Sequence, residues 1–397
     1  KNLVKSKLGM NRGQSARDAT LLTAAPESVA VFRAGDSREY RYYRLPSIAV
    51  SAGGTVLVAC EGYLTEGGDW AVSHILLRRS VDGGKSWLPP QVLATTADGQ
   101  LEQNPMATAQ KLGVPGAITF DNAVLIADRN GAVHLLYCVE YMRCFHMRSD
   151  DDGATFTPAV EITAAFEALR NEYPWKVLAV GPGHGIQLRN GRLVAPVWIS
   201  PGTGNNAHHP SVSATIYSDD HGRNWKAGEI AIPDTAKWVN PNEGTMVELA
   251  DGRVLLDVRT ISTNRRRLQT VSPDGAVGWS RPEYHEQLYE PICAASMIRL
   301  SGAGDGRRNR LLFVNPYTPG VEEWSERRRN LTVRVSYDEG RNWPVGKTLE
   351  PGYAGYSDLA VMPDGTILCV YEAGDPARLT VARFSLEWLT DGQDSLF

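Results

Sequence analysis

SDDHGRNW (218–225) reads Ser-x-Asp-x-Gly-x-x-aromatic, and three further segments repeat this pattern: SVDGGKSW (80–87), SDDDGATF (149–156) and SYDEGRNW (336–343). The first three copies begin 69 residues apart, and the gap before the last holds a degenerate copy, SPDGAVGW (272–279), whose glycine comes one position early. Ser and Asp side chains bond nearby backbone amides, and glycine supplies a positive φ. The pattern therefore predicts a recurring hairpin turn with an aromatic ring packed beneath it.

Short β-branched or alternating runs flank these turns, as in ILLRRS (75–80), LTVRVS (331–336) and TILCVYEA (366–373). Units of about 65 residues, each too small to bury its own face, are typical of propeller blades. The sequence predicts an all-β fold, a single six-bladed β-propeller over residues 31–397, with an N-terminal extension (residues 1–30) packed on it. Two helical segments, 163–172 and 383–389, are expected to decorate the propeller.

Composition narrows the class of protein. The chain has 397 residues, with 41 Lys and Arg against 45 Asp and Glu, a net charge of −4. This balance gives no global basic field for nucleic acid, and the basic runs 264–268 and 325–330 read as solvated faces, apart from Arg328. No apolar run reaches the roughly 18 residues of a membrane span, so membrane insertion is not expected.

The remaining motifs do not favour a metal, a cofactor or a disulfide scaffold. The five cysteines are odd in number and form no CxxC pair; Cys138 and Cys144 could pair across a turn, but buried free thiols are the simpler reading. Asp-x-Asp-x-Gly begins a calcium loop, yet the glutamate expected at its twelfth position does not follow. His208 and His209 stand without further ligands at a metal spacing and are expected to be loop residues.

Five segments break the repeat: YYRLPSIAV (42–50), GPGHGIQL (181–188), NEGTMVELADGRVLLDVRT (242–260), SERRRN (325–330) and GYSDLAVMPDGTILCVYEAG (355–374). Together with the turn repeats they resemble, in the same order and over nearly the whole chain, the exo-α-sialidases (neuraminidases) of bacteria and animals. YRLP stands in place of that family's Arg-Ile-Pro motif. Taken singly, each charged residue would read as a surface pair and Tyr356 as packing.

The resemblance assigns roles residue by residue. It implies three arginines that bind a substrate carboxylate, a tyrosine nucleophile with its partner glutamate, an aspartate acid/base and two supporting carboxylates. These are, in turn, Arg44, Arg259 and Arg328; Tyr356 with Glu243; Asp69; and Glu372, which orients Arg44, with Glu61 supporting the same region. Arg327 and Arg329 are expected to point away from the site.

Elementary physics supports these roles. Guanidinium groups about 6 Å apart repel by roughly 3 kcal/mol per pair at an effective dielectric of about 20, so a fold gathers three of them to bind an anion. A substrate with its carboxylate on the anomeric carbon repels an anionic nucleophile, which favours a neutral tyrosine. Ionising a tyrosine of pKa about 10 at pH 7 costs about 4 kcal/mol, hence the adjacent glutamate.

The resemblance implies a retaining exo-glycosidase, free of cofactor and metal, that hydrolyses terminal α-linked sialic acid or a related nonulosonic acid from glycoconjugates. Two alternatives stay open: transfer of the sugar to another acceptor or to its own ring, and a non-catalytic propeller that binds glycans or proteins. One departure concerns CEGY (60–63), where Tyr63 stands at the position of a family arginine that faces the O4 side of the sugar. Because such substrates are mostly extracellular, export or a periplasmic location is expected.

Overall fold

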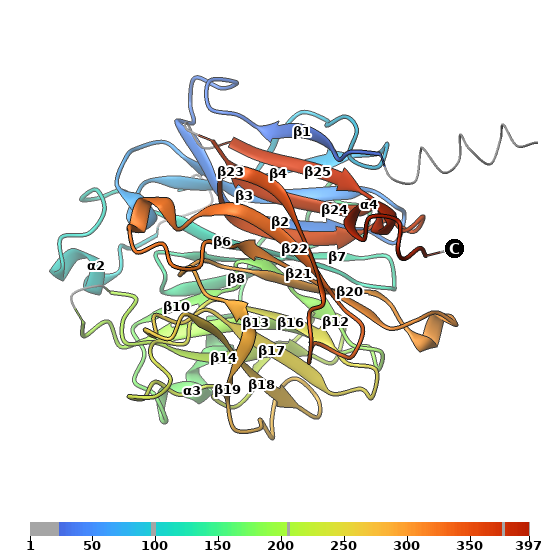
Figure 1. The fold of residues 1–397 in the computed structure, drawn as a ribbon. Coiled ribbons are helices and arrows are strands. Elements are labelled where there is room, and N and C mark those ends of the chain that lie inside the picture. Colours follow the sequence, from blue (N-terminus) through green and yellow to red (C-terminus); the bar gives the residue numbers. More distant parts are fainter. Residues whose placement is uncertain (1–23, 97–100, 205–206, 375–377, 397) are drawn as a thin grey trace, which may run out of the picture.

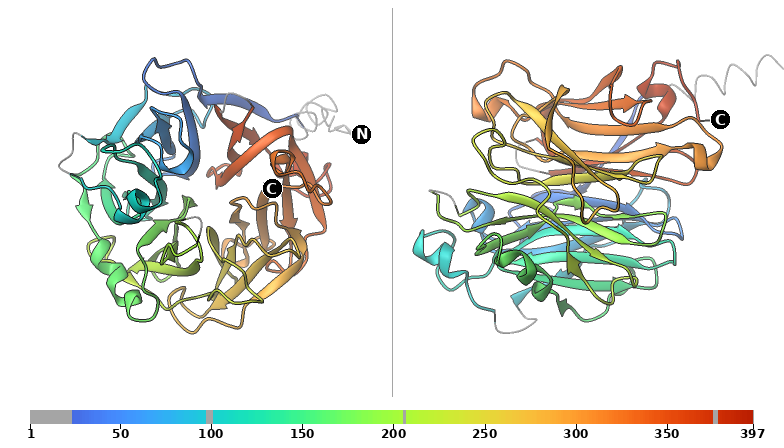
Figure 2. Two further views of the ribbon diagram at one scale, coloured as in Figure 1. Left: turned by 90° about the vertical axis from the view of Figure 1, so that its left-hand side faces the viewer. Right: turned by 90° about the horizontal axis from the view of Figure 1, so that it is seen from below.

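The structure is a computed structural model that describes residues 24–96, 101–204, 207–374 and 378–396. Its strands form a ring of six blades around a central axis, seen end-on in Figure 2. Blade one consists of β2 (Tyr42–Val50), β3 (Val56–Tyr63), β4 (Ser73–Ser80) and β5 (Gln91–Ala94), and blade two of β6 (Phe120–Ala127), β7 (Val133–Val139), β8 (Arg143–Ser149) and β9 (Val160–Glu161). Blade three consists of β10 (Val177–Val180), β13 (Leu193–Ser200), β14 (Val212–Ser218) and β15 (Lys226–Ala227). Blade four consists of β16 (Gly244–Glu248), β17 (Val254–Val258), β18 (Arg266–Ser272) and β19 (Glu283–Tyr289). Two short strands lie near the axis: β11 (Gly183–His184) pairs with β6 in parallel, and β12 (Ile186–Gln187) pairs with β13.

Blades five and six share one long strand, β23 (Val345–Val361). Its first part pairs with β22 and its second part with β24, so hydrogen bonds join both blades into one seven-stranded sheet. The other strands of these blades are β20 (Ser296–Ser301), β21 (Arg310–Pro316), β22 (Arg329–Ser336), β24 (Ile367–Ala373) and β25 (Arg378–Phe384). The prediction of a six-bladed β-propeller is confirmed, whereas the fusion of its last two blades was not foreseen.

The ring is closed by the N-terminal strand. β1 (Glu27–Phe32) pairs antiparallel with β25, the last strand of the chain, and so completes blade six (Figure 1). Of the extension expected over residues 1–30, residues 1–23 lie outside the described residues. Arg78 Nη1 of blade one donates to Val31 O at 2.7 Å, so β1 also joins blade six to blade one.

The recurring turns form as predicted. In the first copy Gly84 N donates to Ser80 Oγ at 2.8 Å and Ser86 N donates to Asp82 Oδ1 at 2.9 Å. The degenerate copy makes the same turn, because Gly275 N donates to Ser272 Oγ at 2.9 Å despite its shifted position. These contacts span a few residues only, which is why the sequence predicts them.

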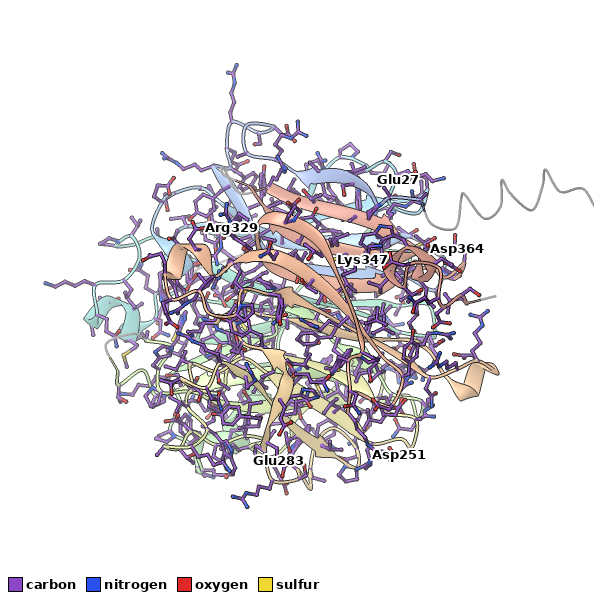
Figure 3. All side chains as sticks on the ribbon, in the orientation of Figure 1. Glu27, Asp251, Glu283, Arg329, Lys347 and Asp364 are labelled. Carbon is purple, nitrogen blue, oxygen red and sulfur yellow. The ribbon has the colours of Figure 1, made fainter. Side chains whose placement is uncertain are left out.

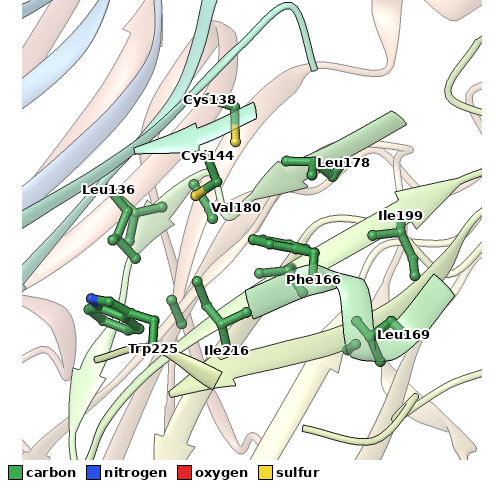
Figure 4. Packing of buried hydrophobic residues seen from close by; sticks show 14 of the residues in the cluster. Leu136, Cys138, Cys144, Phe166, Leu169, Leu178, Val180, Ile199, Ile216 and Trp225 are labelled. Atoms are coloured by element: carbon green, nitrogen blue, oxygen red, sulfur yellow. The ribbon is translucent and has the colours of Figure 1, made fainter. Parts of the chain in front are cut away.

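The hydrophobic core is divided among the blade interfaces. Each of six clusters of buried apolar residues lies between two neighbouring blades, because the two faces of a blade are each covered by the next sheet. Figure 4 shows the cluster between blades two and three, with Phe166 at its centre, Trp225 at the lower left and Cys138 and Cys144 at the top. All five cysteines are buried and free, as the simpler reading predicts.

Short helices decorate the ring near the predicted segments. The first predicted segment forms a 3₁₀ turn, η3 (Thr163–Phe166), that runs into α3 (Glu167–Arg170). The second is partly strand, since β25 ends at Phe384 and α4 (Leu386–Leu389) begins only after Ser385 caps it. Another helix, α2 (Pro105–Ala109), has no counterpart among the predictions. In the described ranges, no helix is long and apolar enough to cross a membrane.

Candidate active site

One mouth of the ring holds a cavity of about 800 Å³ on the central axis. Its walls come from the same end of every blade, where the inner strands begin. The contributing residues, from blade one to blade six, include Arg44, Asn122, Trp198, Glu243, Ile292 and Tyr356. Several lining residues have left-handed backbone, among them Leu45 (φ 53°), Asn122 (φ 55°) and Ile292 (φ 64°). Such conformations cost about 1–3 kcal/mol each for a side-chain-bearing residue and concentrate at functional sites.

The hydroxyl group of Tyr356 lies between a carboxylate and a guanidinium group. It donates to Glu243 Oε1 at 2.5 Å and accepts from Arg259 Nη1 at 2.7 Å. Arg259 Nη1 also donates to Glu243 Oε2 at 2.5 Å, so the three side chains close a triangle at the floor of the cavity. Tyr356 is 5% exposed and Glu243 is 7% exposed. The phenol proton can therefore pass directly to Glu243.

The surroundings of Tyr356 oppose its ionisation at rest. Burial raises the pKa of Tyr356 well above its usual range and the Glu243 carboxylate adds to the shift, against the opposing effects of Arg259 and Arg328. The ring packs against Leu45, Cys293 and Ala294, which keep water from this side of the phenol. The resting nucleophile candidate is therefore a neutral phenol.

Arg44 joins two carboxylates at the seam between blades one and six. Its Nη1 donates to Asp69 Oδ1 at 3.0 Å, and its Nε lies 3.4 Å from Glu372 Oε1. Glu372 is 1% exposed and also accepts from the backbone amides of Leu45 at 3.1 Å and Tyr356 at 3.2 Å. The carboxylate that was expected to orient Arg44 therefore also holds the backbone of Tyr356.

Arg328 differs from the other two arginines. Its Nη2 donates to Ile292 O at 3.2 Å, and no carboxylate among the described residues forms an ion pair with it. The left-handed turn at Ile292 is held in place by Glu290, whose Oε1 accepts from Ile292 N at 2.6 Å. The sequence neighbours of Arg328 make other contacts. Arg327 Nη2 donates to Glu322 O, and the exposed Arg329, labelled in Figure 3, pairs with Glu326.

The three predicted arginines converge on Tyr356. The guanidinium carbons of Arg328 and Arg44 lie 5.0 Å and 5.7 Å from the centre of its ring, and Arg259 bonds its hydroxyl. Burial and, more weakly, the nearby Arg259 and Arg44 lower the pKa of Arg328, but Cys293 and Tyr356 raise it, and the net shift is upward. The structure thus brings together cations that repel one another, and it leaves Arg328 with its guanidinium free of any acidic partner in the described chain.

Asp69 lies at the edge of the cavity in a short 3₁₀ turn, η1 (Gly68–Trp70). Burial would raise the pKa of Asp69, but the Arg44 guanidinium, with a smaller contribution from His208, lowers it below its usual range. Without ligand, this carboxyl group is therefore held in its ionised form by Arg44.

Glu61 and Tyr63 lie behind the wall of the cavity and do not line it. Both are fully buried, and the Tyr63 hydroxyl donates a short hydrogen bond to Glu61 Oε2. Burial raises the pKa of Glu61 to about 8, although hydrogen bonds from Tyr63 and Asn122 N counteract it. The rings of Tyr63 and Tyr42 stack with their centres 4.5 Å apart. The Tyr63 side chain, at the position where the family often has an arginine, therefore does not face the cavity. The lining residue nearby in the fold is Asn122.

Sequence reasoning missed an aromatic wall opposite the arginines. Tyr141, Trp198 and His208 line the cavity, and the ring of His208 lies 4.6 Å from that of Tyr141 and 5.0 Å from that of Trp198. Burial lowers the pKa of His208 to about 4, against the opposing effect of Asp69, so the wall is neutral. His208 lies in a loop, as expected, but its place in the wall depends on packing between distant segments, and no local pattern signals it.

The described part of the chain contains no cluster of three or more His, Cys, Asp or Glu side chains arranged to hold a metal ion. What the cavity offers instead is an anion site of three guanidinium groups beside a phenol and two carboxylates. Such a site suits a ligand with a carboxylate next to its reacting centre.

Comparison with known proteins agrees with this class of site. The family described as BNR repeat-like domain matches residues 118–369. The sialidase of Micromonospora viridifaciens is 32% identical over 362 residues, covering 87% of this chain, and the sialidase of Bacteroides fragilis is 26% identical over 373 residues, also covering 87%. The chain spans 52% and 62% of the lengths of these two relatives. Among solved structures, the Hadza microbial sialidase Hz136 superposes with a TM-score of 0.75 at 23% identity, over 91% of this chain and 69% of the other.

Fold and site together define a BNR-repeat β-propeller with an arginine-lined central cavity. The chain belongs to the BNR repeat-like domain family, and the curated relatives it is similar to are sialidases.

Proposed function

We propose that the chain is a retaining exo-α-sialidase, which hydrolyses terminal α-linked sialic acid, or a related nonulosonic acid, from glycoconjugates. One observation carries the proposal: the hydroxyl of Tyr356 is bonded to both Glu243 and Arg259 while Arg44 and Arg328 flank its ring. This arrangement supplies a carboxylate grip and a neutral nucleophile within one cavity, which a sugar with an anomeric carboxylate requires.

In the first step the substrate carboxylate binds Arg44, Arg259 and Arg328. Tyr356 Oη attacks the anomeric carbon as its proton passes to Glu243, and the bond to the leaving oxygen breaks. The phenolate character that develops is stabilised by Arg259, which donates to the same oxygen at 2.7 Å. Glu243 thereby removes most of the cost of ionising a buried phenol.

Asp69 donates the proton to the leaving oxygen in this proposal. Arg44 keeps Asp69 ionised in the free protein, and a substrate carboxylate that pairs with Arg44 neutralises that cation. The pKa of Asp69 then rises, so binding itself prepares the acid. In the second step Asp69 removes a proton from water, which displaces Tyr356 from the anomeric carbon with net retention of configuration, and the departing phenolic oxygen takes its proton back from Glu243.

The test compares wild type, Tyr356→Phe and Tyr371→Phe with the fluorogenic 4-methylumbelliferyl α-ketoside of N-acetylneuraminic acid and its deaminated analogue. Tyr371 is a buried tyrosine on the adjacent strand β24 that does not line the cavity, so it serves as the matched control. We expect Tyr356→Phe to lose about 10³-fold or more in kcat and Tyr371→Phe to stay within about threefold of wild type.

Product analysis completes the test. Proton NMR should show the α-anomer of the free acid as the first product, before mutarotation. Initial release of the β-anomer would refute the retaining mechanism. An anhydro or transferred sugar as product would mean that the reaction is transfer and not hydrolysis. Binding without turnover of either ketoside would mean that the propeller binds glycans without catalysis.

A further inference from the structure

A buried carboxylate, Asp358, lies on the central axis below the cavity. It is 1% exposed and stands two residues beyond Tyr356 on β23. Its Oδ1 accepts from His184 Nδ1 at 2.7 Å, Ser296 Oγ at 2.8 Å and Leu359 N at 3.0 Å, and its Oδ2 accepts from Ile48 N at 2.9 Å. The proposed chemistry uses none of these groups.

These contacts join four inner strands at one side chain. Ile48 belongs to β2, His184 to β11, Ser296 to β20 and Asp358 to β23, so the carboxylate connects segments that are far apart in sequence. Two motifs that the sequence singled out, GPGHG and YSDL, therefore meet as one ion pair. Burial would lower the pKa of His184, but Asp358 raises it, which favours the imidazolium partner of the pair.

The hydrogen bonds of Asp358 matter because the strand pairing of β2 and β23 is irregular close to them. β2 shifts register between Arg44 and Ser47, and β23 shifts register against β24 between Ala354 and Ser357. Arg44 is the last paired residue before the bulge of β2, and Tyr356 lies within the bulge of β23, so regular strand pairing does not fix the segments that carry them. Glu372 accepts from the amides of Leu45 and Tyr356, which lie within the two bulges, and just beyond them Asp358 of β23 accepts from the amide of Ile48 of β2. Two buried carboxylates thus hold the bulged segments of both strands.

We propose that Asp358, held by His184 and Ser296, is a positioning residue that fixes the strand of Tyr356 against the strand of Arg44. The inference rests on the proposed function, since it explains how the nucleophile is aligned with the bound carboxylate. Asp358 does not touch the substrate. It acts through the two bulged segments, and a displacement of Tyr356 by a fraction of an ångström lowers the rate.

Asp358→Asn is the direct test, because an amide keeps the size of the side chain but turns one acceptor into a donor. Whichever way the amide lies, a donor faces Ile48 N or the His184 and Ser296 donors. We expect kcat for the N-acetylneuraminic acid ketoside to fall about ten- to hundredfold. KM should stay within about threefold, since Arg259 and Arg328 are held by Glu243 and Ile292 O and still bind the carboxylate.

Asp128→Asn is the matched control. Asp128 is also 1% exposed and accepts from His221 Nδ1 at 2.7 Å, Gln187 Nε2 at 2.8 Å and Asn130 N at 3.0 Å, but it lies on no strand that carries a site residue. Both variants should lose stability in thermal melts, and only Asp358→Asn should lose kcat. Ser296→Ala removes one donor and provides a milder variant should Asp358→Asn fail to fold.

Rescue at His184 separates positioning from general packing. His184→Asn keeps a donor near the position of Nδ1, and His184→Ala has none. We expect kcat of the Asn variant within about threefold of wild type and that of the Ala variant at least about tenfold lower. Folded Asp358→Asn and Ser296→Ala variants with the kcat of Asp128→Asn would overturn this inference alone. A wild type that turns over neither ketoside would overturn the proposed function and this inference with it.

Discussion

Arg328 is the residue whose replacement most directly tests the anion site. Arg44 and Arg259 already pair with carboxylates, whereas Arg328 contacts Ile292 O and the face of Tyr356. Arg328→Met keeps the apolar stem but removes the charge-assisted bonds to the substrate, which contribute about 1.5–3 kcal/mol. We expect KM for the sialic acid ketoside to rise about 10- to 100-fold in steady-state kinetics.

The adjacent residue provides the control for that measurement. Arg329 carries the same charge, but it is exposed and pairs with Glu326, so Arg329→Met should leave KM unchanged. A similar rise in KM for both variants would mean that the net charge of the molecule, and not the cavity, attracts the substrate.

At the scale of strands, two buried histidines give blade two a dependence on pH. His134 on β7 and His146 on β8 are 0% and 7% exposed, and their Nδ1 and Nε2 atoms lie 2.9 Å apart. Burial, with His134 and Arg148 adding to it, lowers the pKa of His146 from 6.5 to about 3. Between pH 6.5 and about 3, His146 is therefore protonated in the unfolded chain but neutral in the folded protein.

The sign of the effect follows from this difference. The stability that neutral His146 contributes is fully present above pH 6.5 and is lost as the pH falls toward 3, by roughly 1.4 kcal/mol per pH unit. We expect urea unfolding between pH 7 and 4 to show this slope in wild type and a shallower one in His146→Gln, which does not titrate. Equal slopes in the two proteins would show that other groups govern the acid sensitivity.

The structural elements also show which features can be predicted from the sequence alone. The recurring Ser-x-Asp-x-Gly turns are predictable because Ser80 and Asp82 bond amides within a few residues, so the motif contains its own structure. The order of Arg44, Glu243, Arg259 and Tyr356 within their motifs predicts the site they form. The aromatic wall, the bond from Glu372 to Tyr356 N and the long β23 shared by two blades depend on contacts between segments that no local pattern relates.

For the whole molecule, the decisive feature is where the ring closes. β1 completes blade six next to blade one, and that seam separates Arg44 and Asp69 of blade one from Tyr356 and Glu372 of blade six. The bond from Leu45 N to Glu372 crosses the seam at the cavity, and Phe32 is buried in the apolar cluster that fills it farther out. The contacts that close the ring therefore also join the two halves of the site.

Phe32→Ala and Phe166→Ala separate this coupling from general stability. Phe32 and Phe166 are 3% and 0% exposed, and each truncation should cost about 3–5 kcal/mol of unfolding free energy. Phe166 packs between blades two and three, away from the seam. At a temperature well below both melting midpoints, we expect kcat to fall several-fold in Phe32→Ala only, because a loosened seam lets Arg44 drift from Tyr356. Equal activity of the two variants at that temperature would show that the site is held within its own blades, independently of how the ring is closed.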